Sequence, residues 1–233
     1  LGERLAALPS VKAVSRADVV PLSLNTSDWD VQIPGYQPGP NESMSIYVAI
    51  VAPGYLKALG TPLVSGREFE SRDDSSAARV VVVNRRFAER FWPGQDPLGR
   101  TIRTGGQDHT VIGLTSTGKY VRLGEEPTAY MYLTQAQHWT YGMTLTIRTA
   151  GSAEALIGDL RREVAALDPD LPLAAPQIMD NRMALAFLPA RLAAAALGVF
   201  GVLGLVLASL GVYGVMSRAV AQRRREIGIR VAV

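Results

Sequence analysis

The longest uninterrupted hydrophobic pattern lies near the C-terminus, where the 26 residues between Arg191 and Arg218 carry no charged side chain. A helix of this length extends about 39 Å, whereas the hydrocarbon core of a bilayer is about 30 Å thick. Helices buried in soluble domains rarely stay apolar beyond about 18 residues. The pattern therefore predicts one transmembrane helix over residues 191–217 rather than a helix in a soluble core.

Small residues recur within this apolar run at intervals of three and four positions, which places them along one side of a helix. They are Gly198, Gly201, Gly204, Ala208, Gly211 and Gly214. Small side chains let a second membrane helix approach closely, so we interpret them as a packing surface in a helix bundle. The alternative is the general tolerance of membrane helices for glycine.

Residues 1–190 show shorter patterns, in which strand and helix signals alternate. The clearest is "RVVVVNRRFAERFWPG", where four valines predict a buried strand, Asn84 is suited to capping a helix, and Pro93-Gly94 ends that helix. Further strands are expected at residues 11–22, 45–53, 108–115, 128–133, 142–149 and 173–179. Further helices are expected at residues 1–8, 54–60 and 152–167, and a loop is expected at residues 23–42.

This order of elements predicts an α+β domain over residues 1–190. Both ends of the region are expected to form one lobe, with a second α/β lobe inserted between about residues 53 and 140. The composition, with 48% hydrophobic residues and a mean hydropathy slightly above zero, is compatible with a membrane-attached protein. The absence of cysteine removes disulfides and cysteine-based zinc sites.

Charge is unevenly distributed along the chain. The net charge is +3, but residues 218–233 contain five arginines and one glutamate, so the basic excess belongs to this tail. A nucleic-acid-binding protein spreads Lys and Arg over a folded face, whereas this cluster adjoins the apolar run. Because Lys and Arg are retained on the cytoplasmic side, we expect residues 218–233 in the cytoplasm and residues 1–190 outside the inner membrane.

One stretch has the spacing of a nucleotide-binding loop: "GLTSTGKY" at residues 113–120. Tyr120 stands where such a loop needs Ser or Thr to hold magnesium, and no helix pattern follows it. We therefore interpret the stretch as a strand end and a turn. His109 and His138 lack metal-ligand spacing, and no acid–base pair stands out, so we expect no catalysis, cofactor or metal.

Several stretches resemble the MacB/FtsX-like permease subunits of ABC transporters, which carry a MacB-like periplasmic core domain. The resemblance covers nearly the whole chain and rests on "VAPGYLKALGTPLVSGREF", "VVVNRRFAERFWPGQDPLGRTI", "DPDLP" and "LASLGVYGVMSRAVAQRRREIGIRVAV". The sequence of these stretches is closer to that of relatives that are duplicated permeases, with two such units, than to that of MacB itself. The chain departs from the family before Lys119 and Tyr120, where Ser, Thr and Gly118 replace the usual acidic turn.

The resemblance implies an extracytoplasmic domain over residues 1–190, with a porter-like lobe and an inserted second lobe. A transmembrane helix at 191–217 and a truncated cytoplasmic coupling segment at 218–233 follow. Family members have four membrane helices per unit, so one helix is expected upstream and two downstream. The coupling segment is expected to dock on an ATPase through a short set of residues. These are Arg225, Glu226, Ile227, Gly228, Ile229 and Arg230.

The function implied is that of a permease subunit, which transmits ATP-driven motion across the inner (plasma) membrane to a periplasmic domain. ATP hydrolysis is expected in a separate ABC ATPase subunit. Other expected partners are further permease helices or a second permease unit, the lipid bilayer and a periplasmic adaptor, but no nucleic acid. The alternative is a membrane-anchored binding or scaffold domain without ATPase coupling, with a tail held by anionic lipid. Nothing in residues 1–190 selects a transported substrate.

Overall fold

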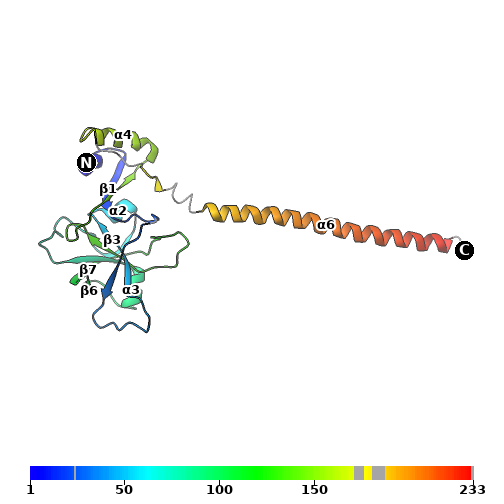
Figure 1. Cartoon of the computed structure of the whole chain (residues 1–233), viewed down its shortest axis with the longest axis horizontal. Helices are drawn as coiled ribbons and strands as arrows, with labels where there is room; N and C mark the ends of the chain where they lie inside the picture. Colours follow the sequence, from blue (N-terminus) through cyan, green and yellow to red (C-terminus); the bar gives the residue numbers. More distant parts are fainter. Residues whose placement is uncertain (24, 171–175, 180–186, 232–233) are drawn as a thin grey trace. The chain divides into compact units, whose positions relative to one another are not determined.

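The computed structural model describes residues 1–23, 25–170, 176–179 and 187–231, with the backbone alone described at 188–190 and 219–231 (Figure 1). The chain divides into two compact units, Leu1–Arg182 and Met183–Val233. Each unit is described by itself below.

In the described part of the first unit, nine strands form one sheet, six of which close into a ring. The strands are β1 (Val11–Ala17), β2 (Asp28–Gln32), β3 (Ser45–Val51), β4 (Leu63–Gly66), β5 (Val80–Asn84), β6 (Thr101–Thr104), β7 (Gln107–Thr115), β8 (Tyr130–Thr134) and β9 (Thr144–Thr149). The ring runs β2-β6-β7-β5-β8-β3 and closes because β2 pairs with both β6 and β3. The β3–β8 and β5–β7 pairs are parallel, and the other ring pairs are antiparallel.

The ring encloses a hydrophobic core made of the inward-facing residues of its strands, as expected for a small barrel. These residues are Val31, Ile46, Val48, Ile50, Val81, Val83, Ile102, Val111, Met131 and Leu133. Helix α3 (Arg85–Phe91) begins directly after β5 and adds Phe87, Phe91 and the following Trp92 to the same core.

A second core covers the outer face of β3, β5 and β8. Helix α2 (Tyr55–Leu59) contributes Tyr55 and Leu56, which are buried with the outward-facing Val80 and Val82 of β5. Strand β5 is therefore buried on both faces. Burial on both faces explains its unbroken run of four valines, since a strand with one wet face would alternate with polar residues.

The first and last elements of this unit pack against each other. Helix α1 (Gly2–Ala6) and helix α4 (Ala153–Ala165) lie together, and β1 pairs with β9. Leu5, Leu160 and Val164 form the small core between them. Arg4 Nε and Glu163 Oε2, 2.8 Å apart, join the two helices at their surface.

The terminal elements are joined to the ring by one strand pairing and by hydrogen bonds around it, among them Ala52 N–H donating to the Arg16 carbonyl at 2.9 Å and Ser15 Oγ donating to the Ala52 carbonyl at 3.0 Å. Strand β1 pairs with β3 at a single position, Ala17 opposite Val51. Next to it, Asp18 N–H donates to the Ile50 carbonyl, and the Asp18 carboxylate accepts from Ile50 N–H at 2.7 Å. Burial raises the pKa of this carboxyl group.

Several predicted elements are confirmed and others are corrected. The strand and capped helix at residues 80–91 are confirmed, and α4 matches the helix predicted at 152–167. The loop predicted over residues 23–42 is wrong in part, because β2 lies within it. The strand predicted at 173–179 falls largely outside the described residues.

The two-lobe division with its insertion at about residues 53–140 stays a prediction. Residues 1–182 form one compact unit, and β2 and β3, which precede residue 53, share the ring with β5 to β8.

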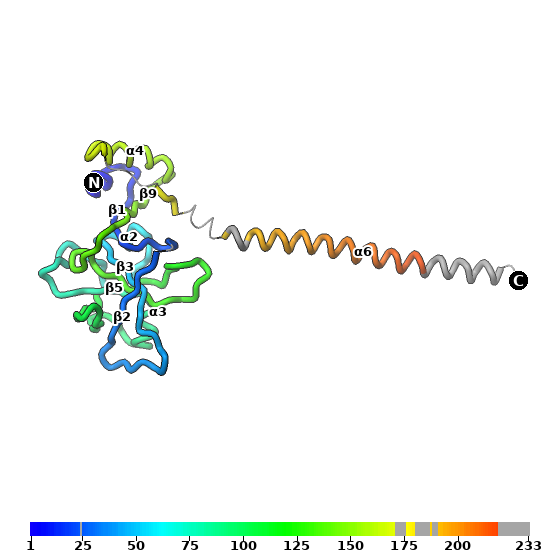
Figure 2. Tube along the Cα trace, viewed as in Figure 1, coloured from blue at the N-terminus to red at the C-terminus, as the bar shows by residue number. Residues whose placement is uncertain are grey.

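The second unit contains a single long element among its described residues, helix α6 (Leu188–Val231), which runs without interruption for 44 residues (Figures 1 and 2).

Candidate functional site

Helix α6 carries a candidate membrane span over Arg191–Arg218, which agrees closely with the span predicted at residues 191–217. No part of its most apolar window is buried inside the protein. Large apolar side chains such as Leu197 and Phe200 are about 70% exposed, at 72% and 70%. Apolar surface on this scale needs a lipid or protein environment, because water would strongly disfavour it.

The small residues of the span do not all share one face. At 100° per residue, Gly201, Gly204, Ala208 and Gly211 fall within about 80° of the helix circumference. Gly198 and Gly214 lie to either side of that sector. The predicted packing surface therefore narrows to its four central residues, and its role stays a prediction.

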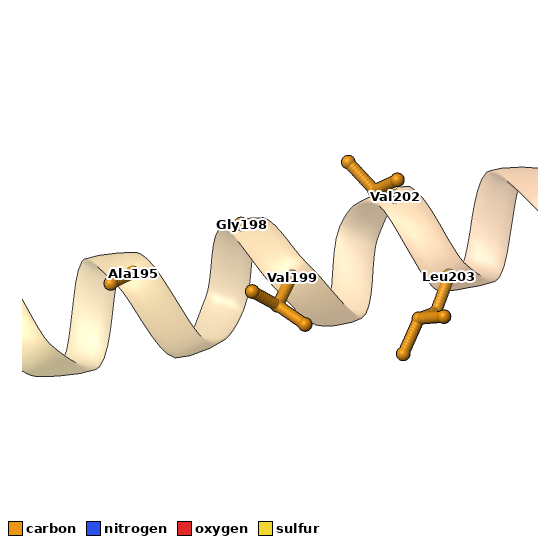
Figure 3. Close-up of a pocket in the computed structure, with 5 residues that line it drawn as sticks. All are labelled: Ala195, Gly198, Val199, Val202 and Leu203. Carbon is orange, nitrogen blue, oxygen red and sulfur yellow. The ribbon is translucent and has the colours of Figure 1, made fainter.

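Larger residues occupy the opposite side of the same helix. Val199, Leu203, Val206, Leu210 and Tyr213 follow one another at spacings of three and four, and they also fall within about 80°. Close to Gly198, which has no side chain, lies a shallow groove lined by Ala195, Gly198, Val199, Val202 and Leu203 (Figure 3). The side formed by Gly201, Gly204, Ala208 and Gly211 is called the smooth face of the span below, and the opposite side, with its larger residues, the ridged face.

The predicted coupling residues, Arg225 to Arg230, lie in the last turns of α6. Their backbone is helical and continuous with the span, and their side chains lie outside the described residues. Their predicted role in docking an ATPase therefore stays a prediction.

The stretch at residues 113–120 is a strand end followed by a loop, as predicted. Strand β7 ends at Thr115, and no helix follows before β8. Tyr120 is buried, and its hydroxyl group accepts hydrogen bonds from Asn84 Nδ2 at 3.1 Å and Gly118 N–H at 3.2 Å.

The backbone N–H groups that follow this stretch already have an acceptor. The Glu125 carboxylate accepts from the N–H groups of Tyr120, Val121 and Arg122 at 2.6, 2.9 and 2.8 Å. A phosphate-binding loop needs such groups free to face the ligand. The Glu125 carboxylate therefore occupies the N–H groups that a phosphate would need.

The two histidines, which are 29 positions apart, meet at the end of the ring where β6 and β7 form a hairpin. Their Nε2 atoms are 3.0 Å apart, and their rings are stacked with centroids 5.0 Å apart. His109 is fully buried on β7, opposite Ile102 of β6. The Trp29 and His138 rings pack in a T-shaped arrangement, with 5.5 Å between their centroids.

The protonation state of the pair follows from its partners. His109 Nδ1 lies 3.0 Å from the Gln107 carbonyl oxygen, which can only accept, so Nδ1 carries a proton. Burial lowers the pKa of His109, which leaves its Nε2 as an acceptor for the Nε2–H of His138. Burial is also the main cause that lowers the pKa of His138 to about 4, and His109 and Arg79 contribute in the same direction.

This pair does not make a convincing metal site. The part of the chain that the structure describes contains no group of three or more His, Cys, Asp or Glu side chains that could hold a metal ion. The positive charge of Arg79 acts on both rings and opposes a further cation there. The pair was not foreseen from the sequence, because neither histidine has a ligand-like neighbour along the chain.

Comparisons with known proteins place these features in a family context. Residues 2–163 match the family described as the MacB-like periplasmic core domain. The probable syringafactin export ATP-binding/permease protein SyfD of Pseudomonas syringae pv. syringae (strain B728a) is 28% identical over 200 residues, which cover 83% of this chain and 31% of SyfD. The probable export ATP-binding/permease protein MacB of Pseudomonas entomophila (strain L48) is 30% identical over 198 residues, covering 78% and 28%.

A solved structure also shares the fold. The periplasmic region of MacB from Actinobacillus actinomycetemcomitans superposes with a TM-score of 0.50 at 17% identity, over 71% of this chain and 72% of that one. The chain spans about a third of the length of the curated relatives it matches.

Proposed function

This chain belongs to the family of the MacB-like periplasmic core domain, and from that premise we propose that it is part of an ABC transporter permease of the MacB/FtsX type. The observation that carries the proposal is the succession of two features in one chain. The family domain occupies residues 2–163, and an unburied apolar helix long enough to cross a membrane follows at Arg191–Arg218. A periplasmic domain followed by such a helix fits a permease of this type, and the family of the domain favours a permease over a simple membrane anchor.

The continuity of α6 supports a role in transmitting motion. Its 44 residues extend about 66 Å, of which the 13 residues beyond Arg218 extend about 20 Å. Beyond Pro189 in its first turn, α6 contains no proline and no break, so its turns are linked by continuous backbone hydrogen bonds and we expect it to move as one body. A push on Arg225–Arg230 is therefore carried through the membrane to the opposite end of the helix.

The direction of the helix follows from its charged ends. Arg218 and the three arginines at 223–225 stand at one end of the span, and we place that end in the cytoplasm. Residues 1–182 then lie on the periplasmic side, as the family description implies.

The proposed cytoplasmic partner is an ABC ATPase. The names of SyfD and of the P. entomophila protein combine ATP binding with a permease. In this chain, the backbone N–H groups at the end of the stretch with nucleotide-loop spacing already donate to the Glu125 carboxylate. As the sequence resemblance implies, we propose that ATP is hydrolysed by a separate subunit, which docks on Glu226, Arg230 and the aliphatic residues between them.

Charge reversal in the full-length permease tests this docking surface. Glu226→Lys and Arg230→Glu are each expected to abolish co-purification with the ATPase and ATP-driven activity, because the partner charges then repel. Glu89→Lys is the control, since Glu89 is exposed on α3 and its nearest cation, Arg86, is 3.8 Å away. This control should leave both measurements unchanged.

The opposite outcome favours the scaffold alternative. If both reversals leave ATPase association and activity unchanged, the tail is not the coupling segment. If binding of the tail to vesicles then depends on anionic lipid and is lost when the arginines at 223–225 become glutamine, the tail is a lipid-bound juxtamembrane stretch.

A further inference from the structure

We propose that His109 and His138 form an acid-sensitive latch, which holds the connection between β8 and β9 against the ring at neutral pH and releases it on acidification. Such a latch would make the extracytoplasmic domain respond to pH. It does not depend on coupling to an ATPase.

The latch is closed by one shared hydrogen bond between two neutral rings. His138 Nε2–H donates to His109 Nε2 across 3.0 Å, while the Nδ1–H of His109 is fixed on the Gln107 carbonyl. The bond needs one unprotonated Nε2 atom. If both rings are protonated, the two Nε2–H groups face each other with no acceptor between them, a cost that the backbone of Ile102, which favours the protonated form of His109, offsets only in part because burial still lowers the pKa of His109.

The charges around the latch disfavour its protonation. Arg79, in the segment before β5, acts electrostatically on both rings and holds the His138 turn by donating from Nη1 to the Gln137 carbonyl at 2.9 Å. Asp108 on β7 is the acidic group that acts on His109, but it is largely exposed and lies 3.9 Å from Arg103. Trp29 packs against His138 from β2 without a charge. A proton on either ring therefore adds positive charge near Arg79, and among the described residues no buried carboxylate acts on the pair to compensate it.

The segment held by the latch is a tight and well-bonded turn. The N–H groups of Gln137 and His138 both donate to the Thr134 carbonyl at 3.1 Å. The Gln137 side chain accepts from Val80 N–H at 3.0 Å and donates to the Asp74 and Ala78 carbonyls at 3.1 and 3.0 Å. The latch bonds this turn to β7, so its release frees the His138 side of the turn from β7, while Gln137 stays bonded to Val80, Asp74 and Ala78.

An exposed aromatic pair follows the latch directly. Trp139 and Tyr141 are 74% and 95% exposed and contact each other at 4.2 Å between ring centroids. Residues 135–147 contain no charged side chain. Release of the latch therefore changes how a neutral, aromatic surface is presented, and it loosens the chain segment that leads from the ring into β9.

The first experiment measures the protonation of the two histidines directly. The full chain, with isotope-labelled histidine in lipid nanodiscs, gives two side-chain signals by NMR, because the sequence contains two histidines. His138 is expected to titrate near pH 4 and His109 also below 6.5, with a step in each signal when the other titrates. The proposal is overturned if both titrate independently near 6.5.

The second experiment measures opening of the held segment. A histidine whose pKa falls from 6.5 in the open turn to about 4 in the closed turn makes opening roughly twentyfold more favourable at pH 5 than at pH 7. Amide hydrogen exchange of residues 135–143, corrected for the intrinsic effect of pH, should show that change.

Two variants separate the latch from other acid effects. His138→Gln keeps an N–H donor toward His109 Nε2 and removes one titrating group, so the exchange of residues 135–143 should lose most of its pH dependence. Asp108→Asn, which removes the neighbouring exposed carboxylate, should keep it. An equal response in wild type and His138→Gln would contradict the latch.

Discussion

Asn84 shows how one side chain can join several segments of the ring. It is completely buried, and its Oδ1 accepts from the N–H groups of Phe87 and Tyr130 at 2.9 and 3.1 Å. Its Nδ2 donates to the Tyr120 hydroxyl at 3.1 Å and to the Thr128 carbonyl at 2.8 Å. The sequence predicts the cap, because Asn stands between a strand and a helix pattern. It does not predict the other three bonds, whose partners lie 36 to 46 positions away.

Asn84→Ala is expected to lower the free energy of unfolding by about 2–4 kcal/mol, because it removes a helix cap and leaves buried donors and acceptors without partners. Ser152→Ala is the matched control, since Ser152 caps α4 at the surface through a 3.4 Å bond. The control should cost at most about 1 kcal/mol. Urea unfolding of both variants checks the difference, and equal losses would contradict it.

Two glycines with similar backbone angles give a second test at this scale. Gly66 has a φ of +76°, and an added Cβ would lie 2.2 Å from the Ile112 carbonyl oxygen. Gly94 has a φ of +69° with no atom within 4 Å of an added Cβ. Gly66→Ala should cost about 3 kcal/mol or more, because backbone atoms must move, and Gly94→Ala about 1 kcal/mol. Thermal or urea unfolding measures both.

At the scale of elements, local signals and long-range pairing contribute differently. Strand β5 and helix α3 are predictable because their valine run, cap and paired phenylalanines lie within 15 residues of one another. Strand β2 is not, because Pro, Gly, Asn and Ser around it are typical of a loop. What makes Asp28–Gln32 a strand is pairing with β3 and with β6, which is about 70 residues further along.

The loop between β2 and β3 is attached to α3 by a cluster around Glu42. Its carboxylate accepts from Gly39 N–H at 2.9 Å, from the Tyr36 hydroxyl at 2.7 Å and from Arg90 Nη2 at 2.8 Å. These bonds lower the pKa of Glu42 to about 2, and the bond from Gly39 N–H has the largest effect.

Glu42→Gln tests this attachment through its pH dependence. A carboxyl group with a lowered pKa stabilises the fold above its unfolded pKa of 4.5, and the contribution is lost as pH falls toward 2. Wild type should therefore lose more stability than the variant between pH 4.5 and pH 2.5, and the two should be closer at the lower pH. Parallel curves of unfolding free energy against pH would show that the cluster contributes nothing.

At the scale of the whole molecule, the sequence predicts the membrane helix more reliably than the ring. A span is defined by length and the absence of charge, which can be read along the chain. Ring closure depends on which distant strands pair, and no local pattern records that choice. The meeting of His109 with His138 has the same origin, since it follows from the position of the turn after β8 beside β7.

The smooth face of α6 makes a prediction for the assembled permease. A Cβ added at Gly204 meets nothing within 4 Å in this chain, so the fold itself does not require glycine there. Gly204→Leu should weaken association with the neighbouring membrane helices by about 1–2 kcal/mol. Val206→Leu, on the opposite face, should have little effect. Cross-linking yield in the full-length permease measures both, and equal yields would mean that the smooth face is turned toward lipid.

The closure of the ring, and the way in which β1 joins it at β3, have a mechanical consequence. Every strand of the ring has a partner on both sides, so sliding one strand requires breaking two ladders at once, and the ring is stiff under shear. The terminal elements are not closed in this way: β1 pairs with β3 at one position, Ala17 opposite Val51, and hydrogen bonds of Asp18, Ser15 and Ala52 surround that position. Under a pulling force on the chain after α4, we therefore expect the terminal elements to shift before any strand of the ring slides.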